Sequence, residues 1–367
     1  MNEKVGRFLV FVGSYAEPAD TGIYVFSLDA ATGELGRLYE ESGLKNPSFL
    51  DVDHEGRKLY AISQTEKTGQ EPGGSAVAFD FDPHTGRLNR LNEEPTVARS
   101  TCHIQFNAEH RYVVATSYHG GMVGLLPVLK DGSLGKTTDV RQHEGKGPNP
   151  VRQDRAHPHS ANADPDNRFL YVPDLGTDRI YIYRVERMKF VPVGETPAAP
   201  GAGPRHMAFH PTRPYAYVIN ELNSTVTVFA RNAESGTLEE LESVSTLPET
   251  FTGENYCAEI QVSPNGKFVY GSNRGHDSIA VFAVDETNGR LELVEIVSSQ
   301  GKFPRHFAIS PDGRYLLAAH QDTGNLVVFR IEERTGKLHD TGYRAEAAKG
   351  VCVKFWKHPV SENSRRH

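Results

Sequence analysis

Histidine, arginine and carboxylate side chains recur beside apolar segments that have the length of β-strands. One group precedes or opens such segments: His103, His157, His159, Arg205, His206, Glu259, Arg305 and His306. A second group ends the apolar segments that follow: Tyr15, Tyr118, His119, Asp174, Asn220, Glu221, Asn273, Arg274 and His320. Imidazole titrates near neutral pH, whereas guanidinium stays charged and offers a planar fork of donors to carboxylate or phosphate. The two groups therefore combine acid–base chemistry with anion binding.

The elements that position these side chains form an internal repeat: an apolar strand, a Pro/Asp/Asn/Gly turn, and two further strands. Its clearest copies are HMAFHPTRPYAYVINELNSTVTVFA from His206, EIQVSPNGKFVYGSNRGHDSIAVFAV from Glu259 and FAISPDGRYLLAAHQDTGNLVVFRI from Phe307. The residues that mark the first turn of each copy are Asp53, Asn107, Asp164, His210, Ser263 and Ser310. Subtracting their numbers gives separations of 46 to 57 residues. This is the period of β-propeller blades.

The repeat also predicts how the ring closes. A fourth strand follows most copies after turns such as ATGELGRL and ESGTLEEL, in which glycine supplies the positive φ. VCVKFW from Val351 is a lone first strand, and the N-terminal segments RFLVFVGSY, GIYVFSLD and ELGRLYEE supply its three partners. We therefore predict an all-β fold, a seven-bladed β-propeller of four-stranded antiparallel blades, closed by N- and C-terminal strands in one blade. Residues 1–367 are expected to form this single domain.

The predicted topology gathers the polar groups at one rim of the central channel. In a meander, the first strand starts at the end of the blade where the second strand finishes. The opposite rim receives ordinary turns: DHEGRK, DPDN, HPTRP, SPNGK and SPDGR. Such segregation is typical of a catalytic or ligand-binding mouth. Because several arginines at one narrow mouth repel one another, we expect a small anionic ligand there.

Composition and charge exclude several classes of function. The net charge is −7 and no run of five Lys or Arg occurs, so no nucleic-acid partner is expected. No segment approaches 18 consecutive apolar residues, and the N-terminus lacks the pattern of a signal peptide. We therefore expect no membrane partner, a cytoplasmic location, and a monomer or small homo-oligomer.

Cysteine and metal chemistry are not expected. Cys102, Cys257 and Cys352 are far apart without C-x-x-C spacing, so each is interpreted as a small buried hydrophobe. His157 and His159 could join Glu221 as metal ligands, but a rim dominated by arginines would repel a cation. We expect no metal and no other cofactor, and no P-loop or dinucleotide-binding motif is present.

The segments GAGPRHMAFHP (201–211), YAYVINELNSTV and SNRGHDSIAVF (272–282) resemble the lactonase β-propeller family, which includes propeller-type 6-phosphogluconolactonases. The resemblance extends from VGSYAEPADTGIYVF to PRHFAISPDGRYLLAAHQDTGNLVVF and VCVKF. The family fold, a seven-bladed propeller, agrees with the number of blades derived from the repeat. The same family includes fungal carboxy-cis,cis-muconate cyclases, whose proposed site holds one His, one Glu and two Arg.

By motif, the resemblance implies that this catalytic set corresponds to His159 in HPHSANADPDN, Arg205 in GPRH, Glu221 in NEL and Arg274 in SNRG. Opening a lactone needs an activated water and donors for the developing oxyanion. Either His159 is the general base, or Glu221 is the base and His159 the proton donor. Arg205 and Arg274 are assigned to the substrate phosphate or the oxyanion. The remaining predicted substrate-binding residues are His157, His206, Arg305, His103 and Tyr118; His157 is also an alternative for the histidine role.

The resemblance implies hydrolysis of 6-phosphogluconolactone to 6-phosphogluconate, the lactone-opening step of the pentose phosphate pathway. Two alternatives remain open. One is a lactonising or delactonising enzyme for another acidic substrate, such as carboxymuconate. The other is a non-enzymatic propeller that binds a ligand or a protein in the manner of WD-repeat proteins. The Trp-Asp signature of those proteins is absent, and Trp356 is the only tryptophan in the chain.

Overall fold

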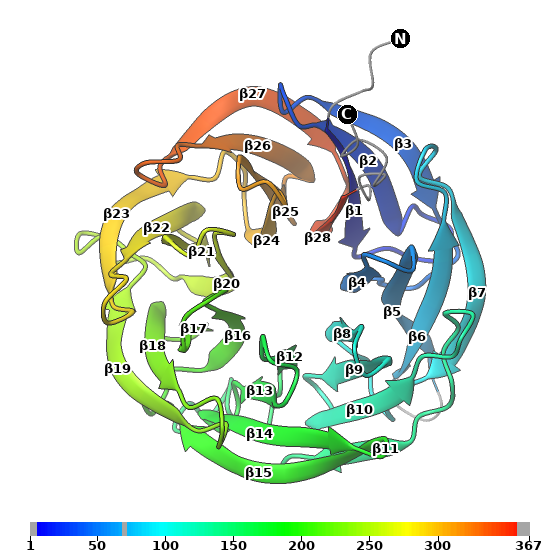
Figure 1. Cartoon of the computed structure of the whole chain (residues 1–367), viewed down its shortest axis with the longest axis horizontal. Helices are drawn as coiled ribbons and strands as arrows, with labels where there is room; N and C mark the ends of the chain where they lie inside the picture. The colour runs from blue at the N-terminus through cyan, green and yellow to red at the C-terminus, as the bar shows by residue number, and fades with distance from the viewer. Residues whose placement is uncertain (1–5, 68–71, 358–367) are drawn as a thin grey trace, which may run out of the picture.

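The computed structural model, which describes residues 6–67 and 72–357, consists of seven four-stranded antiparallel sheets arranged in a ring around a channel (Figure 1). The prediction of a seven-bladed propeller is confirmed. Within these residues no α-helix is found, and hence no helix that could cross a membrane.

Each blade presents its first strand to the channel (Figure 1). These first strands are β4 (Leu50–Asp53), β8 (His103–Asn107), β12 (Asn162–Ala163), β16 (Pro204–Phe209), β20 (Tyr256–Val262), β24 (Pro304–Ile309) and β28 (Gly350–Lys357). The second strands are β5 (Lys58–Lys67), β9 (Tyr112–Ser117), β13 (Leu170–Asp174), β17 (Tyr215–Asn220), β21 (Phe268–Arg274), β25 (Tyr315–His320) and β1 (Arg7–Ser14).

The third and fourth strands complete each blade toward the outside of the ring. The third strands are β6 (Pro72–Phe81), β10 (Met122–Pro127), β14 (Arg179–Glu186), β18 (Thr225–Arg231), β22 (Ser278–Val284), β26 (Asn325–Ile331) and β2 (Ile23–Asp29). The outermost strands are β7 (Leu88–Pro95), β11 (Asp139–Gln142), β15 (Lys189–Pro197), β19 (Leu238–Ser245), β23 (Leu291–Ser298), β27 (Leu338–Glu346) and β3 (Leu35–Glu41).

The core lies between neighbouring blades. In β17, Tyr217 and Ile219 pack with the following blade, whereas Ala216 and Val218 pack with the preceding one. Successive side chains of a strand point to opposite faces, so a strand covered on both faces has no polar face. This is why the second and third strands are almost continuously apolar, while in outermost strands such as β19 most residues are partly buried or exposed.

A repeated tyrosine hydrogen bond joins adjacent blades. The hydroxyl of a second-strand tyrosine donates to a glycine carbonyl in a turn of the next blade, as in Tyr60 to Gly132 (3.1 Å), Tyr171 to Gly236 (2.8 Å), Tyr217 to Gly289 (3.2 Å) and Tyr270 to Gly336 (2.9 Å). At Gly236, φ is +77° and an added Cβ would lie 2.7 Å from the Phe169 ring. Glycine in these hairpins thus supplies both the turn and the room for the neighbouring blade.

The ends of the chain close the ring as predicted. β28 pairs with β1, and the pairs Val10 with Phe355 and Val12 with Val353 fix the register. The resulting sheet has the order β28-β1-β2-β3, so one blade contains both ends (Figure 1). Closure removes the free sheet edges that an open ring would expose.

The fourth blade departs from the expected regularity, because its first strand is only the two residues of β12. His157 and His159 therefore precede this strand rather than lie on it. The backbone N–H of His157 donates to the carboxylate of Asp174 at 2.7 Å, Pro158 forms an isolated bridge with Asp174, and the N–H of His159 donates to the Pro173 carbonyl at 3.0 Å. The segment before β12 is therefore held against the end of β13, beside the channel mouth.

Candidate active site

A cavity of about 480 Å³ opens at the channel end where first strands start and second strands finish. All seven blades contribute to its wall: Tyr15, Ser48, Gln64, Ser100, Thr101, Cys102, Tyr118, His119, Arg152, His159, Glu221, Tyr256, Arg274, Phe303 and Arg305. We call it the mouth cavity. Of the nine predicted site residues, it contains His159, Glu221, Arg274, Arg305 and Tyr118.

Three arginines converge on Glu221, which is only 3% exposed. Arg274 donates to Oε2 at 2.7 Å, and Nε of Arg205 donates to the same oxygen at 3.0 Å. Arg152 donates to Oε1. Burial alone would raise the pKa of Glu221, but these cations, chiefly Arg274 and Arg205, hold it well below its ordinary value. Glu221 is therefore an ionised anchor for three guanidinium groups.

Arg205 lies behind the cavity wall and is 2% exposed. A second nitrogen, Nη1, donates to the Ala258 carbonyl at 2.7 Å. Burial and the like charges of Arg274 and Arg305 lower the pKa of Arg205 to about 9, so the side chain remains protonated at neutral pH. Arg205 is thus committed to protein partners, whereas Arg274 reaches the cavity itself.

Arg152 is the site residue that sequence reasoning missed. It lies on the long loop between β11 and β12, where Asn149 Oδ1 accepts from its backbone N–H at 3.0 Å. The Gln153 side chain donates to the Leu175 carbonyl at 2.9 Å and fixes the loop to the wall. The Arg152 guanidinium lies 5.2 Å from the centre of the Tyr256 ring. The only signal in the sequence was the loop's content of Pro, Asn and Arg.

His159 borders the mouth cavity but is otherwise enclosed, at 5% exposure. Its Nδ1 is buried without a hydrogen-bond partner among the described residues. Burial first, and then the charge of Arg205, holds the pKa of His159 well below 6.5. The imidazole is therefore neutral at pH 7.

His157 has a supporting position. Its ring stacks on Tyr118 with centroids 4.2 Å apart, Nδ1 contacts the Tyr118 carbonyl at 2.8 Å and Nε2 contacts Asp154 at 3.0 Å. Both ring nitrogens are occupied, and His157 is not part of the cavity wall. The arrangement positions Tyr118, whose hydroxyl lies 3.4 Å from Arg152.

His103 and His206 lie one layer deeper in the channel. The residues five positions before the six first-turn markers form what we call the upper ring: Ser48, Cys102, His159, Arg205, Ala258 and Arg305. The residues four positions before the same markers form the lower ring: Phe49, His103, Ser160, His206, Glu259 and His306. Five of these six residues, all except Ser160, line a second cavity of about 340 Å³, the lower cavity, which Lys354 also lines. Neither His103 nor His206 is part of the mouth cavity wall.

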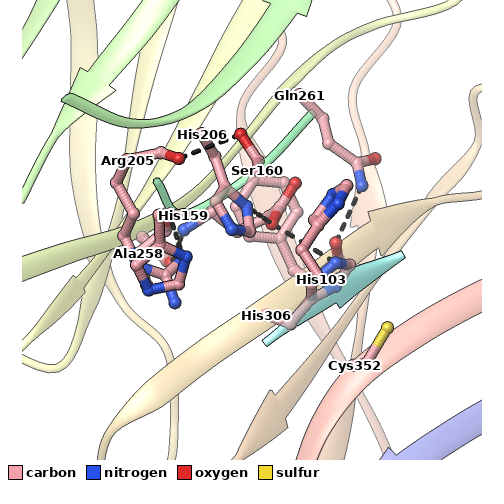
Figure 2. Close-up of polar contacts among 12 residues, drawn as sticks. His103, His159, Ser160, Arg205, His206, Ala258, Gln261, His306 and Cys352 are labelled. Atoms are coloured by element: carbon pink, nitrogen blue, oxygen red, sulfur yellow. Dashed lines mark hydrogen bonds and ion pairs between the residues drawn. The ribbon is translucent and has the colours of Figure 1, made fainter. Parts of the chain in front are cut away.

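The lower ring is organised around Glu259, and Figure 2 shows four other members of the ring, His103, Ser160, His206 and His306. His206 Nδ1 lies 2.7 Å and His306 Nε2 lies 3.2 Å from the same oxygen, Oε2. Burial raises the pKa of Glu259 to about 7 and holds the pKa values of both histidines well below 6.5. His306 Nδ1 accepts from the Val353 N–H at 3.3 Å, so the ring hydrogen of the neutral imidazole is on Nε2, the nitrogen nearest to Glu259.

β-Bulges explain how the first strands serve both layers. The pairing of β16 with β17 shifts register between Pro204 and His206, and that of β24 with β25 shifts between Pro304 and His306. A bulge re-aims the side chain of the extra residue. Arg205 and Arg305 consequently belong to the upper ring, whereas the histidine that follows each of them lies below.

The cysteine prediction is confirmed for Cys257 and Cys352, which are buried, but it is wrong for Cys102. Cys102 is partly exposed and lines the mouth cavity, because the segment before β8 forms part of the wall. Burial raises the pKa of its thiol to about 11. Cys102 is therefore a poor nucleophile at neutral pH.

Neither cavity offers a metal site. Among the residues that the structure describes, no three His, Cys, Asp or Glu side chains are grouped to hold an ion. Glu221 is the carboxylate of the mouth cavity wall, and its oxygens already accept from arginines. The site can therefore bind an anion and hold a neutral base beside it.

Comparisons with known proteins agree with this geometry. The model of the family "Lactonase, 7-bladed beta-propeller" matches residues 9–355. The 6-phosphogluconolactonase of Bacillus subtilis (strain 168) is 37% identical over 301 residues, which are 82% of this chain and 84% of the relative. The 6-phosphogluconolactonase of Formosa agariphila is 33% identical over 309 residues, covering 82% and 86%.

Solved structures give the same result. The periplasmic gluconolactonase PpgL of Pseudomonas aeruginosa is 31% identical, with a TM-score of 0.89 over 96% of this chain and 100% of that one. A candidate 6-phosphogluconolactonase from Bacteroides fragilis NCTC 9343 is 33% identical, with a TM-score of 0.89 over 97% and 99%. The chain belongs to the family of seven-bladed β-propeller lactonases, hydrolases that act on a lactone ester.

Proposed function

We propose that this protein hydrolyses 6-phosphogluconolactone to 6-phosphogluconate. The observation that carries the proposal is a neutral imidazole, His159, bordering a cavity that is lined by three arginines, Arg152, Arg274 and Arg305, and one carboxylate, Glu221. An excess of guanidinium groups suits an anionic lactone, and a neutral imidazole can accept a proton. The names of the relatives from Bacillus subtilis and Formosa agariphila support the phosphorylated substrate.

In the proposed mechanism, His159 removes a proton from water while the water oxygen attacks the lactone carbonyl carbon. The bond between this carbon and the ring oxygen then breaks, and the imidazolium returns its proton to the departing oxygen. The new carboxylic acid loses its proton to solvent. Arg274 and Arg152 stabilise the oxyanion, because both reach the cavity with charged donors.

The choice of base follows from charge. Both candidates have lowered pKa values, but for different reasons: Glu221 is surrounded by cations, whereas His159 is buried. Protonation of Glu221 would break its pairing with three arginines. Protonation of His159 costs desolvation but leaves the arginine cluster intact, and the Glu221 charge offsets part of that cost. We therefore assign His159 as the base and Glu221 as the residue that positions the arginines.

A second candidate substrate is the unphosphorylated glucono-lactone. Its support is the likeness to the periplasmic gluconolactonase of Pseudomonas aeruginosa, which is as strong in TM-score as the likeness to the Bacteroides fragilis structure. The two candidates differ only in the phosphate, so the difference lies in substrate binding and not in the chemistry of ring opening.

The test is the initial rate of hydrolysis above the spontaneous background, measured on both lactones with the wild-type protein and with His159→Asn. We expect the higher kcat/KM on the phosphorylated lactone and a loss of about 10²- to 10⁴-fold in His159→Asn. His339→Asn, a change on outermost strand β27, is the matched control. Wild-type rates at background on both lactones would refute the proposal.

A further inference from the structure

Two blades of the propeller begin their first strands with the same three residues, Pro-Arg-His, at 204–206 and at 304–306. In the first, Pro204 pairs with the last residue of the second strand, Asn220, and in the other Pro304 pairs with His320. The paired residues in the two blades differ by 100 in residue number. Residues 221 and 321, which follow the second strands, therefore occupy equivalent positions at the mouth.

Backbone hydrogen bonds confirm this equivalence. The N–H of Glu221 donates to the Gly203 carbonyl at 2.8 Å, and the N–H of Gln321 donates to the Phe303 carbonyl at 3.0 Å. The side chains differ, since the first blade offers a carboxylate and the second an amide. Arg205 therefore has a counterion in its own blade, whereas the equivalent arginine, Arg305, does not.

Arg305 is left without a polar partner. Among the described residues it makes no hydrogen bond or ion pair, and its guanidinium lies 5.6 Å from the centre of the Tyr15 ring. The Oε1 atom of Gln321, the residue that replaces the carboxylate, is also buried without a partner. Arg305 nevertheless lines the mouth cavity beside His159 and Arg274.

The charge of Arg305 adds to an unbalanced cluster. Three arginines share Glu221, so a fourth leaves the mouth with a clear excess of positive charge. Arg305 contributes to the lowered pKa values of Arg205 and Arg274, as expected for like charges in a partly dry site. An anion bound at Arg305 would relieve this repulsion.

One neutral donor belongs to a residue that contacts Arg305. The Tyr15 ring lies 5.6 Å from the Arg305 guanidinium, and both residues line the mouth cavity and the narrow gap beneath it. Hydroxyl and guanidinium groups are the donors that phosphate oxygens accept from.

We propose that Arg305, with Tyr15, forms a phosphate subsite that is separate from the arginine cluster on Glu221. The phosphate monoester of the sugar lactone binds there, while the lactone carbonyl lies toward His159, Arg274 and Arg152. This rests on the proposed lactonase function. It reassigns the phosphate from Arg205 and Arg274, since Arg205 is committed to Glu221 and Ala258.

The first test compares Arg305→Gln with the wild-type protein on phosphorylated and unphosphorylated glucono-lactone. The measured quantity is the ratio of the two kcat/KM values. We expect Arg305→Gln to lower this ratio by about 10- to 100-fold, mainly through KM, because a charged hydrogen bond to the phosphate is lost. Arg330→Gln, an exposed arginine on β26, is the control. An unchanged ratio, with or without a parallel fall on both lactones, would overturn the subsite.

The second variant, Gln321→Glu, gives Arg305 the carboxylate that Arg205 already has. It should lower the preference for the phosphorylated lactone in the same direction as Arg305→Gln while the arginine remains present. Melting temperatures of both variants establish that they fold. A preference that stays at the wild-type value in a folded Gln321→Glu protein would contradict the role assigned to uncompensated charge.

A binding measurement separates the subsite from the lactonase function. Titration calorimetry with 6-phosphogluconate and with gluconate needs no catalysis. If the wild-type protein hydrolyses neither lactone but binds 6-phosphogluconate through Arg305, the function fails and the subsite stands. If hydrolysis is found and neither binding nor the substrate ratio depends on Arg305, the subsite fails and the function stands.

Discussion

The mouth cavity and the lower cavity each contain a buried carboxylate, but the two acids have opposite environments. Glu221 accepts from three arginines and has a pKa well below its ordinary value. Glu259 faces two neutral histidines, and burial raises its pKa to about 7. Burial is the largest single influence on both acids, so the charged neighbours decide the direction of the shift.

This difference assigns substrate binding to the mouth cavity and packing to the lower ring. At the mouth, excess cations hold an ionised carboxylate and remain available to an anionic substrate. In the lower ring, the charges are largely suppressed, and Phe49 packs against His103, His206 and His306 with ring centroids 4.3 to 5.8 Å apart. The lower ring thus serves as a floor for the active site, although it contains histidines that could do chemistry elsewhere.

The largest expected effect is that of Glu221→Gln. Removing this carboxylate leaves three arginines without their shared counterion, and breaking a buried ion pair by removing one partner costs about 3–5 kcal/mol of stability. We also expect kcat/KM on the phosphorylated lactone to fall at least about 100-fold as the arginines lose their positions. Urea unfolding and lactone hydrolysis measure the two effects. If Glu221→Gln is as active and as stable as the wild-type protein, the two buried carboxylates do not differ in role and the contrast between Glu221 and Glu259 is wrong.

Glu259→Gln should act mainly through the pH dependence of stability. Because the folded-state pKa of Glu259 is about 7 and that of an unfolded chain about 4.5, the folded protein binds more protons between these values. The contribution of this group to the free energy of unfolding therefore falls as pH rises through that window. Glutamine cannot titrate, so the variant should gain stability relative to wild type by on the order of 3 kcal/mol from pH 4.5 to above 7.

Urea unfolding of both proteins across this pH range measures that gain. The depressed pKa values of His103, His206 and His306 act in the opposite sense, since their contribution is lost as pH falls below 6.5. They are present in both proteins, but His206 and His306 contact Glu259, so the difference between the two curves reports Glu259 together with its coupling to these histidines. A pH-independent difference would show that Glu259 titrates normally.

The pH–rate profile tests whether the pKa of His159 lies below that of an ordinary histidine. A general base is active when deprotonated, so kcat/KM should fall as pH drops through its pKa. Because burial and Arg205 hold that pKa well below 6.5, the acid limb should lie below pH 6.5. The measurement is kcat/KM from pH 4.5 to 8 with the spontaneous rate subtracted. An acid limb at or above pH 6.5 would assign the titration to another group.

Tyr118→Phe should have the smallest effect. The Tyr118 hydroxyl lies 3.4 Å from Arg152, and its ring rests on His157. Phenylalanine keeps the stacking and removes one long hydrogen bond, which is worth about 1 kcal/mol or less. We expect kcat/KM to change by less than about 10-fold, with no change in melting temperature. A loss as large as that of His159→Asn would place the hydroxyl at the reacting atoms.

Much of the site could be predicted because the repeat fixes which chain positions face the mouth. His159, Glu221, Arg274, Arg305 and Tyr118 all line the mouth cavity as the topology indicated. The sequence analysis did not distinguish the two rings, although successive positions of one strand differ in depth. This is why His103 and His206 were grouped with residues that lie above them.

Other features depend on contacts between segments that are far apart in sequence. Arg152 lies on a loop without a repeat pattern, and its place is set by Asn149, Gln153 and the carbonyl of Leu175. The position of His157 depends on Asp174, which accepts its backbone N–H. No periodicity describes such hydrogen bonds, so the sequence could only mark the loop as unusual.

The sequence by itself determined the architecture, because strand alternation, glycine turns and a period near fifty residues repeat locally along the chain. It also determined which rim carries the arginines. Only the tertiary structure decided how they are used, since charge pairing depends on which side chains meet across blades. Arg152 lies on the loop before β12 and Arg274 ends β21, yet both meet Glu221, which follows β17 in the blade between them.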